Sequence, residues 1–167
     1  YSVTSWQNSL KNIENDQLKQ KYSLTDNGVD IKSLPAPRYD LIKKNRFVSY
    51  PLQATRGCPF KCNYCSIIQF YEYKYNKRPV EEIIKDLASI PAKYIHFVDD
   101  NLMEDKTFSI NLFTAMKKYK KIWGTQSTVN VAKSPELLSA AYSSGCKFIA
   151  VEEIIKDLAS IPAKYIH

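Results

Sequence analysis

Apolar runs alternate with amphipathic segments through residues 51–151. Four segments have the strand pattern, and the three segments between them repeat apolar residues every three or four positions, as helices do. The expected strands cover 52–55, 94–98, 123–131 and 146–151, and the expected helices begin at Pro79, before Phe108 and at Pro135. Strands that alternate with helices of this length predict an α/β fold with a parallel sheet or barrel.

Local signals mark the ends of these elements. Pro79 is a helix-opening residue, Ser134 is a typical N-cap before a proline, and Gly145 is placed to end the last helix. The run 94–98 is continuously apolar and predicts a strand buried on both faces. His96, in the middle of this run, is therefore expected to be a core residue and not a metal ligand.

The first 50 residues are polar and weakly patterned. Trp6, Leu10 and Ile13 have helical spacing and predict one short amphipathic helix, which is followed by a turn signal at 25–28 and a proline-containing stretch at 34–38. We interpret 1–50 as an irregular and helical linker. The chain starts at Tyr1 without a signal-peptide pattern, and no apolar run is long enough to span a membrane, so we expect a cytoplasmic piece of a longer reading frame.

An internal repeat interrupts the pattern at the end of the chain. Residues 80–96 recur without a single difference as residues 151–167. Two identical copies do not make a solenoid, which needs at least three repeats. The junction runs directly from a strand pattern into a helix pattern without a loop. We therefore expect a recent duplication or an artefact, and 151–167 takes no part in the functional prediction.

The charge of the chain has two interpretations. The net charge is +7, which could indicate nucleic-acid binding. However, 20 of the 24 basic residues are Lys and only 4 are Arg, the residue that recognises phosphate and guanine in a bidentate manner. An AT-rich genome would produce this composition without selection for a partner, so nucleic acid is not the expected partner.

Three of the four cysteines lie close together. Cys58, Cys62 and Cys65 form a C-x3-C-x2-C run directly after the first expected strand. Close thiolates can converge on one soft metal centre, such as an iron–sulfur cluster or zinc. A structural zinc site normally uses four protein ligands in two separated pairs, so the single run of three favours a cluster with one open iron.

This motif resembles that of the radical S-adenosylmethionine (SAM) superfamily. The resemblance implies that Cys58, Cys62 and Cys65 bind a [4Fe-4S] cluster whose open iron chelates SAM. Electron transfer from the cluster would then cleave SAM to methionine and a 5′-deoxyadenosyl radical. Tyr64, the aromatic residue before the last cysteine, would lie beside the adenine, although ordinary packing is the alternative. The implied fold is an incomplete parallel (β/α) barrel, with about four strands present in 51–150.

Further segments resemble one branch of this superfamily, the proteins with a cobalamin-binding domain. They are 34–41 (LPAPRYDL), 50–66 (YPLQATRGCPFKCNYCS), 77–82 (KRPVEE), 97–101 (FVDDN) and 123–127 (WGTQS). The resemblance implies that 1–50 includes the tail of a missing cobalamin domain. The parent would be a cobalamin-dependent methyltransferase or a related radical enzyme, reduced by a donor such as flavodoxin or ferredoxin. Its substrate, small or macromolecular, is beyond the reach of the sequence.

Secondary sites follow from the same resemblance. Asp99, Asp100 and Asn101 fall where the family meets the amino group of SAM, and acidic acceptors suit an ammonium. A plain strand-to-helix turn capped by Asn101 is the alternative. Gln126 and Ser127 would either face the cofactor or line the barrel. No catalytic side chain can be assigned.

Other functions remain open at this point. A radical SAM methylthiotransferase has a similar cysteine motif, and a non-catalytic module stapled by iron–sulfur or zinc belongs to a different class. The fragment lacks about two β/α units of a full barrel, so we expect it to have little or no activity alone.

Overall fold

The computed structural model describes residues 10–17, 31–42, 47–62 and 65–151. The chain divides into two units, 1–36 and 37–167. In the first unit, residues 10–14 are helical, which agrees with the expected N-terminal helix as far as the described residues extend. A short 3-10 helix, η1, covers Ile31–Ser33.

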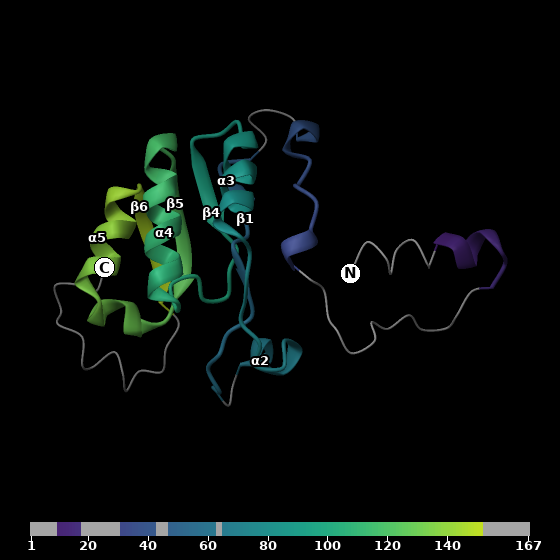
Figure 1. Cartoon of the computed structure of the whole chain (residues 1–167), viewed down its shortest axis with the longest axis horizontal. Coiled ribbons are helices and arrows are strands. Elements are labelled where there is room, and N and C mark those ends of the chain that lie inside the picture. Colours follow the sequence, from purple (N-terminus) through teal and green to yellow (C-terminus); the bar gives the residue numbers. More distant parts are fainter. Residues whose placement is uncertain (1–9, 18–30, 43–46, 63–64, 152–167) are drawn as a thin grey trace. The chain divides into compact units, whose positions relative to one another are not determined.

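The second unit is built on a parallel sheet of four strands (Figure 1). The strands are β1 (Tyr50–Leu52), β4 (Tyr94–Phe97), β5 (Ile122–Ser127) and β6 (Cys146–Val151). Their order in the sheet is the same as their order in the chain, β1-β4-β5-β6. A separate antiparallel pair, β2 (Thr55–Arg56) with β3 (Asn76–Lys77), lies beside the cysteine loop. The predicted α/β class with about four parallel strands is confirmed.

Helices connect successive strands. They are α2 (Ser66–Phe70), α3 (Val80–Ser89), α4 (Lys106–Met116) and α5 (Pro135–Ser143), with short 3-10 helices η2 (Tyr39–Leu41), η3 (Lys117–Tyr119) and η4 (Val129–Lys133). Neighbouring strands joined in sequence by right-handed crossovers place their helices on one face of the sheet.

Local chemistry explains where the helices begin and end. The side chain of Asp105 accepts a hydrogen bond of 2.9 Å from the backbone N–H of Phe108 and so caps α4. Pro135 occupies the first turn of α5, as predicted. Gly145 follows α5 with a φ of +104°, a conformation that suits glycine after a helix.

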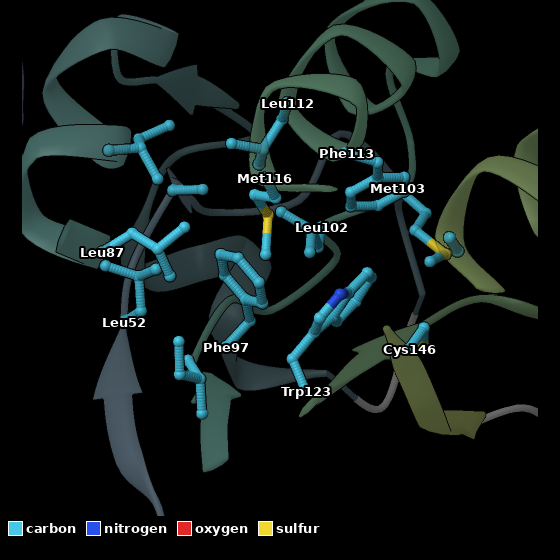
Figure 2. Close-up of a cluster of buried hydrophobic side chains, with 14 of the residues drawn as sticks. Leu52, Leu87, Phe97, Leu102, Met103, Leu112, Phe113, Met116, Trp123 and Cys146 are labelled. Atoms are coloured by element: carbon cyan, nitrogen blue, oxygen red, sulfur yellow. The ribbon is translucent and has the colours of Figure 1, made fainter. Parts of the chain in front are cut away.

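The core lies between the helices and the covered face of the sheet (Figure 2). Phe97 of β4 and Trp123 of β5 pack edge to face, with ring centroids 5.3 Å apart. The ring of Phe113 of α4 packs on Trp123 at a tilt of 35°, with centroids 4.8 Å apart. Leu87 of α3 and Leu52 of β1 close the same cluster and are almost completely buried. Apolar burial of this extent is the main stabilising contribution to the sheet. We call this cluster the sheet core.

Three strand predictions differ from the structure. β4 is not buried on both faces: Ile95 and Phe97 are buried, whereas Tyr94 is exposed and His96 is half-buried. The reason is that helices cover one face only, so His96 lies on the uncovered face and outside the core. The strand expected over 123–131 ends at Ser127 and continues as η4.

The first expected strand, 52–55, is also divided in two. Tyr50–Leu52 joins the parallel sheet, and Thr55–Arg56 turns away to pair with β3. The first copy of the repeat forms α3 and most of β4, with Ile83 and Leu87 fully buried. The second copy lies outside the described residues except for Val151. Among the helices that the structure describes, none has the length and apolar character needed to cross a membrane.

Candidate functional site

The cysteine loop follows β1 at the carboxyl-terminal edge of the sheet. Because the four strands are parallel, the residues after β1, β4 and β5 meet at this same edge. β1 leads through Ala54 and Thr55 into Cys58, and β4 leads into Asp99, Asp100 and Asn101. The polar side chains after β4 hydrogen-bond to residues after β1 and to the end of β5. We call Asp99, Asp100, Asn101 and their hydrogen-bond partners the strand-end network.

Asp99 anchors the start of the cysteine loop. Its fully buried carboxylate accepts hydrogen bonds from the backbone N–H groups of Ala54 and Thr55 and one of 2.7 Å from the Thr55 hydroxyl. Burial raises the pKa of Asp99 to about 6, and the hydrogen bonds from Thr55 and Ala54 oppose that rise. The carboxylate thus ties the segment after β1 to the end of β4.

Asp100 holds the next residue of the loop. Its carboxylate accepts a hydrogen bond of 2.9 Å from the backbone N–H of Gly57. Gly57 has a φ of +86°, and a Cβ added there would lie 2.1 Å from the carbonyl oxygen of Lys74. Only glycine meets both requirements, so the turn that presents Cys58 depends on Gly57 and Asp100 together.

Asn101 connects the network to the first cysteine. Its side chain is fully buried, and its Nδ2 lies 3.8 Å from Cys58 Sγ and 3.2 Å from Glu104 Oε2. The hydroxyl of Ser127, at the end of β5, donates to Asn101 Oδ1 at 3.3 Å. The structure therefore brings the predicted residues Cys58 and Asn101 into direct contact.

The three loop cysteines are half-buried free thiols. The backbone N–H of Cys65 donates to the carbonyl of Cys62 at 3.1 Å, which folds the second half of the motif into a turn. Burial raises the pKa of the Cys58 thiol, while N–H groups of Phe60 and Asn101 lower it. Cys146 lies elsewhere, in the sheet core, and burial raises its pKa to about 11. The predicted adenine contact, Tyr64, lies outside the described residues.

The donor set is that of a soft metal centre. Three thiols from one loop, with N–H groups directed at the first, match the ligands and hydrogen-bond donors that iron–sulfur clusters use in proteins. In the part of the chain that the structure describes, no three Cys, His, Asp or Glu side chains converge tightly enough to hold a single metal ion. The three thiols of the loop are the ligand type that an iron–sulfur cluster uses.

The remaining predicted residues lie on the strand ends. Gln126 of β5 is half-buried and shares its face of the sheet with His96, since residues of the same parity point the same way. Arg56 donates to the side chain of Gln53 at 2.7 Å and stays within its own loop.

Several contributors to the site were not predicted from the sequence. Glu104 contacts Asn101, and the hydroxyl of Tyr75 donates to the carbonyl of Asn101 at 3.1 Å. Arg78 is buried, forms an ion pair of 2.7 Å with Asp86 and donates to the carbonyl of Gln53. The Tyr75 contact joins residues 26 positions apart, and no local spacing marks it, whereas Glu104 lies only three positions after Asn101. For Arg78 the available signal was its place in the segment 77–82, directly before the helix-opening Pro79.

Comparison with known proteins finds methylases and methyltransferases among the similar sequences. The chain is 27% identical over 130 residues to the hopanoid C-2 methylase of Rhodopseudomonas palustris, an alignment that covers 72% of this chain and 25% of that protein. It is 27% identical over 122 residues to the cytidylyl-2-hydroxyethylphosphonate methyltransferase of Streptomyces wedmorensis, covering 66% and 23%. It is 23% identical over 107 residues to the bacteriochlorophyllide d C-12(1)-methyltransferase of Chlorobaculum tepidum, covering 60% and 24%.

The chain thus spans about a quarter of the length of the curated relatives it matches. No protein-family model matches it. Among solved structures, it resembles TsrM from Kitasatospora setae, a radical S-adenosylmethionine methyltransferase solved with cobalamin and a [4Fe-4S] cluster bound. The TM-score is 0.52 at 16% identity, over 67% of this chain and 24% of TsrM. This similarity confirms the fold.

Proposed function

We propose that the chain carries the cluster-binding part of a radical SAM methyltransferase of the cobalamin-binding branch, because its sequence is similar to methylases and methyltransferases and its fold is similar to that of TsrM. In this proposal Cys58, Cys62 and Cys65 bind a [4Fe-4S] cluster. The observation that carries the proposal is the position of the cysteine loop: it follows the first strand at the carboxyl-terminal edge of a parallel sheet, tied to the end of the next strand by Asp99 and Asp100. Parallel α/β folds bind their ligands at this edge.

The chain's own residues would have distinct tasks at this site. The cysteine thiolates would bind iron, and a bound cluster supplies one electron for the reductive cleavage of SAM. Asp100 and Gln126, both half-buried at the strand ends, are proposed to face the amino group and other polar groups of SAM, with Tyr64 beside the adenine. The carboxylate of Asp99 already accepts several hydrogen bonds within the protein, which favours a positioning task for it.

The whole enzyme is proposed to need more than this chain contains. A cobalamin domain would carry the methyl group, and a reducing protein such as flavodoxin or ferredoxin would supply electrons in the cytoplasm. The substrate contacts are expected in the barrel units beyond this chain. The chain alone is therefore expected to bind the cluster and to show weak or no methyl transfer.

Anaerobic reconstitution with iron and sulfide tests the proposal. The full chain is expected to take up about four irons and to show the broad visible absorption and, after reduction, the electron paramagnetic resonance (EPR) signal of a [4Fe-4S] cluster. Cys58→Ser, Cys62→Ser and Cys65→Ser should each lose most of this cluster. The matched control is Cys146→Ser, which removes the remaining cysteine outside the loop and should keep the cluster.

The same experiment separates the alternatives. A colourless chain that retains stoichiometric zinc would refute the enzyme proposal and favour a structural metal module. Reductive cleavage of added SAM to 5′-deoxyadenosine would support the radical SAM assignment. Transfer of a methylthio group by the full-length parent would favour the methylthiotransferase alternative over the cobalamin-dependent methyltransferase.

A further inference from the structure

Asn101 is a fully buried amide between three side chains from different parts of the chain. Its Nδ2 contacts Cys58 Sγ at 3.8 Å and Glu104 Oε2 at 3.2 Å, and its Oδ1 contacts the Ser127 hydroxyl at 3.3 Å. The backbone carbonyl of the same residue accepts a hydrogen bond from Tyr75. Both ends of the side chain and the main chain are therefore held.

Chemistry determines which way the amide faces. A carboxylate only accepts hydrogen bonds, so Glu104 must meet the NH2 group. A cysteine sulfur that binds iron is likewise an acceptor, and the NH2 group has a second hydrogen for it. The carbonyl end is then left for the hydroxyl of Ser127, which donates. A flipped amide would place its oxygen against the Glu104 carboxylate.

The contact singles out one cysteine of the motif. Among the hydrogen bonds of the described residues, a side chain donates to Cys58 but to neither Cys62 nor Cys65. The donor, Asn101, follows β4, whereas the cysteine loop follows β1. The NH2 group of Asn101 lies between the Cys58 sulfur and the negatively charged carboxylate of Glu104. An N–H group directed at a cluster sulfur stabilises the added negative charge of the reduced state.

We propose that Asn101 is a positioning residue that fixes Cys58 Sγ and makes the cluster easier to reduce, with Ser127 holding its amide in place. This inference rests on the proposed function, because it presupposes a cluster on Cys58. It assigns Asn101 to the protein's own sulfur and not to the amino group of SAM.

A redox titration of the reconstituted full chain tests the inference. The midpoint potential is measured by EPR during titration with dithionite, which supplies one electron per cluster. Asn101→Leu has a similar volume and no donor, and it should lower the ratio of reduced to oxidised cluster at a fixed potential by three- to tenfold; tenfold corresponds to about 59 mV for one electron. Ser127→Ala should shift the ratio in the same direction by a smaller factor, because the amide loses its anchor.

Ser109→Ala is the matched control. Ser109 is also a fully buried serine, but its hydroxyl donates to the carbonyls of Leu102 and Asp105 and has no contact with the Asn101 amide. It should leave the midpoint unchanged. An unchanged midpoint in Asn101→Leu with full iron content would overturn the inference.

If Asn101→Leu does not fold, the midpoint potential of Ser127→Ala tests the inference instead. A midpoint equal to that of Ser109→Ala would then overturn the inference. A wild-type chain that takes up no cluster is a different result, because it refutes the proposed function itself, whereas an unaltered potential in the variants refutes only the task of Asn101.

Discussion

The sheet core and the strand-end network are both buried, but different forces hold them. In the sheet core, Phe97, Trp123 and Phe113 make contacts that are individually weak and non-directional. In the strand-end network, the carboxylates of Asp99 and Asp100 accept directed hydrogen bonds from backbone N–H groups of Ala54, Thr55 and Gly57. The core therefore stabilises the sheet, and the network determines where the cysteine loop lies.

This difference has a functional consequence. A core tolerates changes of side chain if its volume and apolar character are kept. A hydrogen-bond network loses its geometry when one donor or acceptor is removed, since the partner remains buried without a replacement. Substitutions in the core should thus change stability alone, whereas substitutions in the network should also change the cysteine loop.

The largest effect is expected from Phe97→Ala in the sheet core. The ring is fully buried against Trp123, and its loss should lower the free energy of unfolding by about 3–5 kcal/mol. Urea denaturation followed by circular dichroism measures this change. Val98→Ala, at an exposed neighbour, is the control and should have little effect. A loss below about 1 kcal/mol for Phe97→Ala would contradict the assignment of the core.

A smaller, pH-dependent effect is expected at Asp99. Its pKa is raised to about 6 in the folded chain, above the ordinary carboxyl value, so the folded state binds the proton more tightly than the unfolded state. The contribution to stability is therefore largest at low pH and is lost as the pH rises to about 6. Two pKa units correspond to about 3 kcal/mol. Asp99→Asn cannot titrate and should lack this dependence.

Comparing the wild type with Asp99→Asn separates the titration of Asp99 from that of the other carboxyl groups. The difference in unfolding free energy between wild type and Asp99→Asn should decrease between pH 4 and pH 6, and then stay constant to pH 8, as measured by urea denaturation in steps of pH. A difference that does not change across this range would show that Asp99 titrates normally. At pH 7 the variant should still be less stable, because in either orientation of the amide its NH2 group replaces an oxygen that accepts a hydrogen bond from the N–H of Ala54.

The two regions also differ in how much the sequence predicts. The helices of the core were predictable because apolar residues such as Leu112 and Met116 recur with helical spacing, and the position of the cysteine loop followed from its place after the first strand. The uncovered face of β4 was not predictable, since the run 94–98, with one histidine among apolar residues, reads the same whether one face of the strand or both are buried. The contacts of Asn101 with Ser127 and Cys58 join residues 26 and 43 positions apart, and no local spacing encodes them.

A pair of glycines tests whether the loop and the core respond differently. Gly57 and Gly145 both have positive φ, and in each an added Cβ would lie about 2 Å from a carbonyl oxygen, of Lys74 and of Lys121. Replacement by alanine should lower the free energy of unfolding by at least about 1–2 kcal/mol in each case. Gly57→Ala should in addition reduce the iron content after reconstitution, whereas Gly145→Ala should not. Equal iron content in the two variants would mean that the turn at Gly57 does not position the cysteines.

The smallest effect is expected from a charge that lies close to the loop in sequence but is exposed. Lys74 pairs with Glu72 at 2.8 Å, and the side chains of both are more than half exposed. Water and salt screen such a pair, so Lys74→Gln should change neither the urea midpoint nor the iron content measurably. Both quantities are measured under the conditions used for Gly57→Ala. The comparison is close in space, because the backbone carbonyl of Lys74 is the group that an added Cβ at Gly57 would meet. A loss of iron in Lys74→Gln would show that exposed charges also hold the loop. The buried hydrogen bonds of the strand-end network would then not be sufficient to explain how the cysteines are placed.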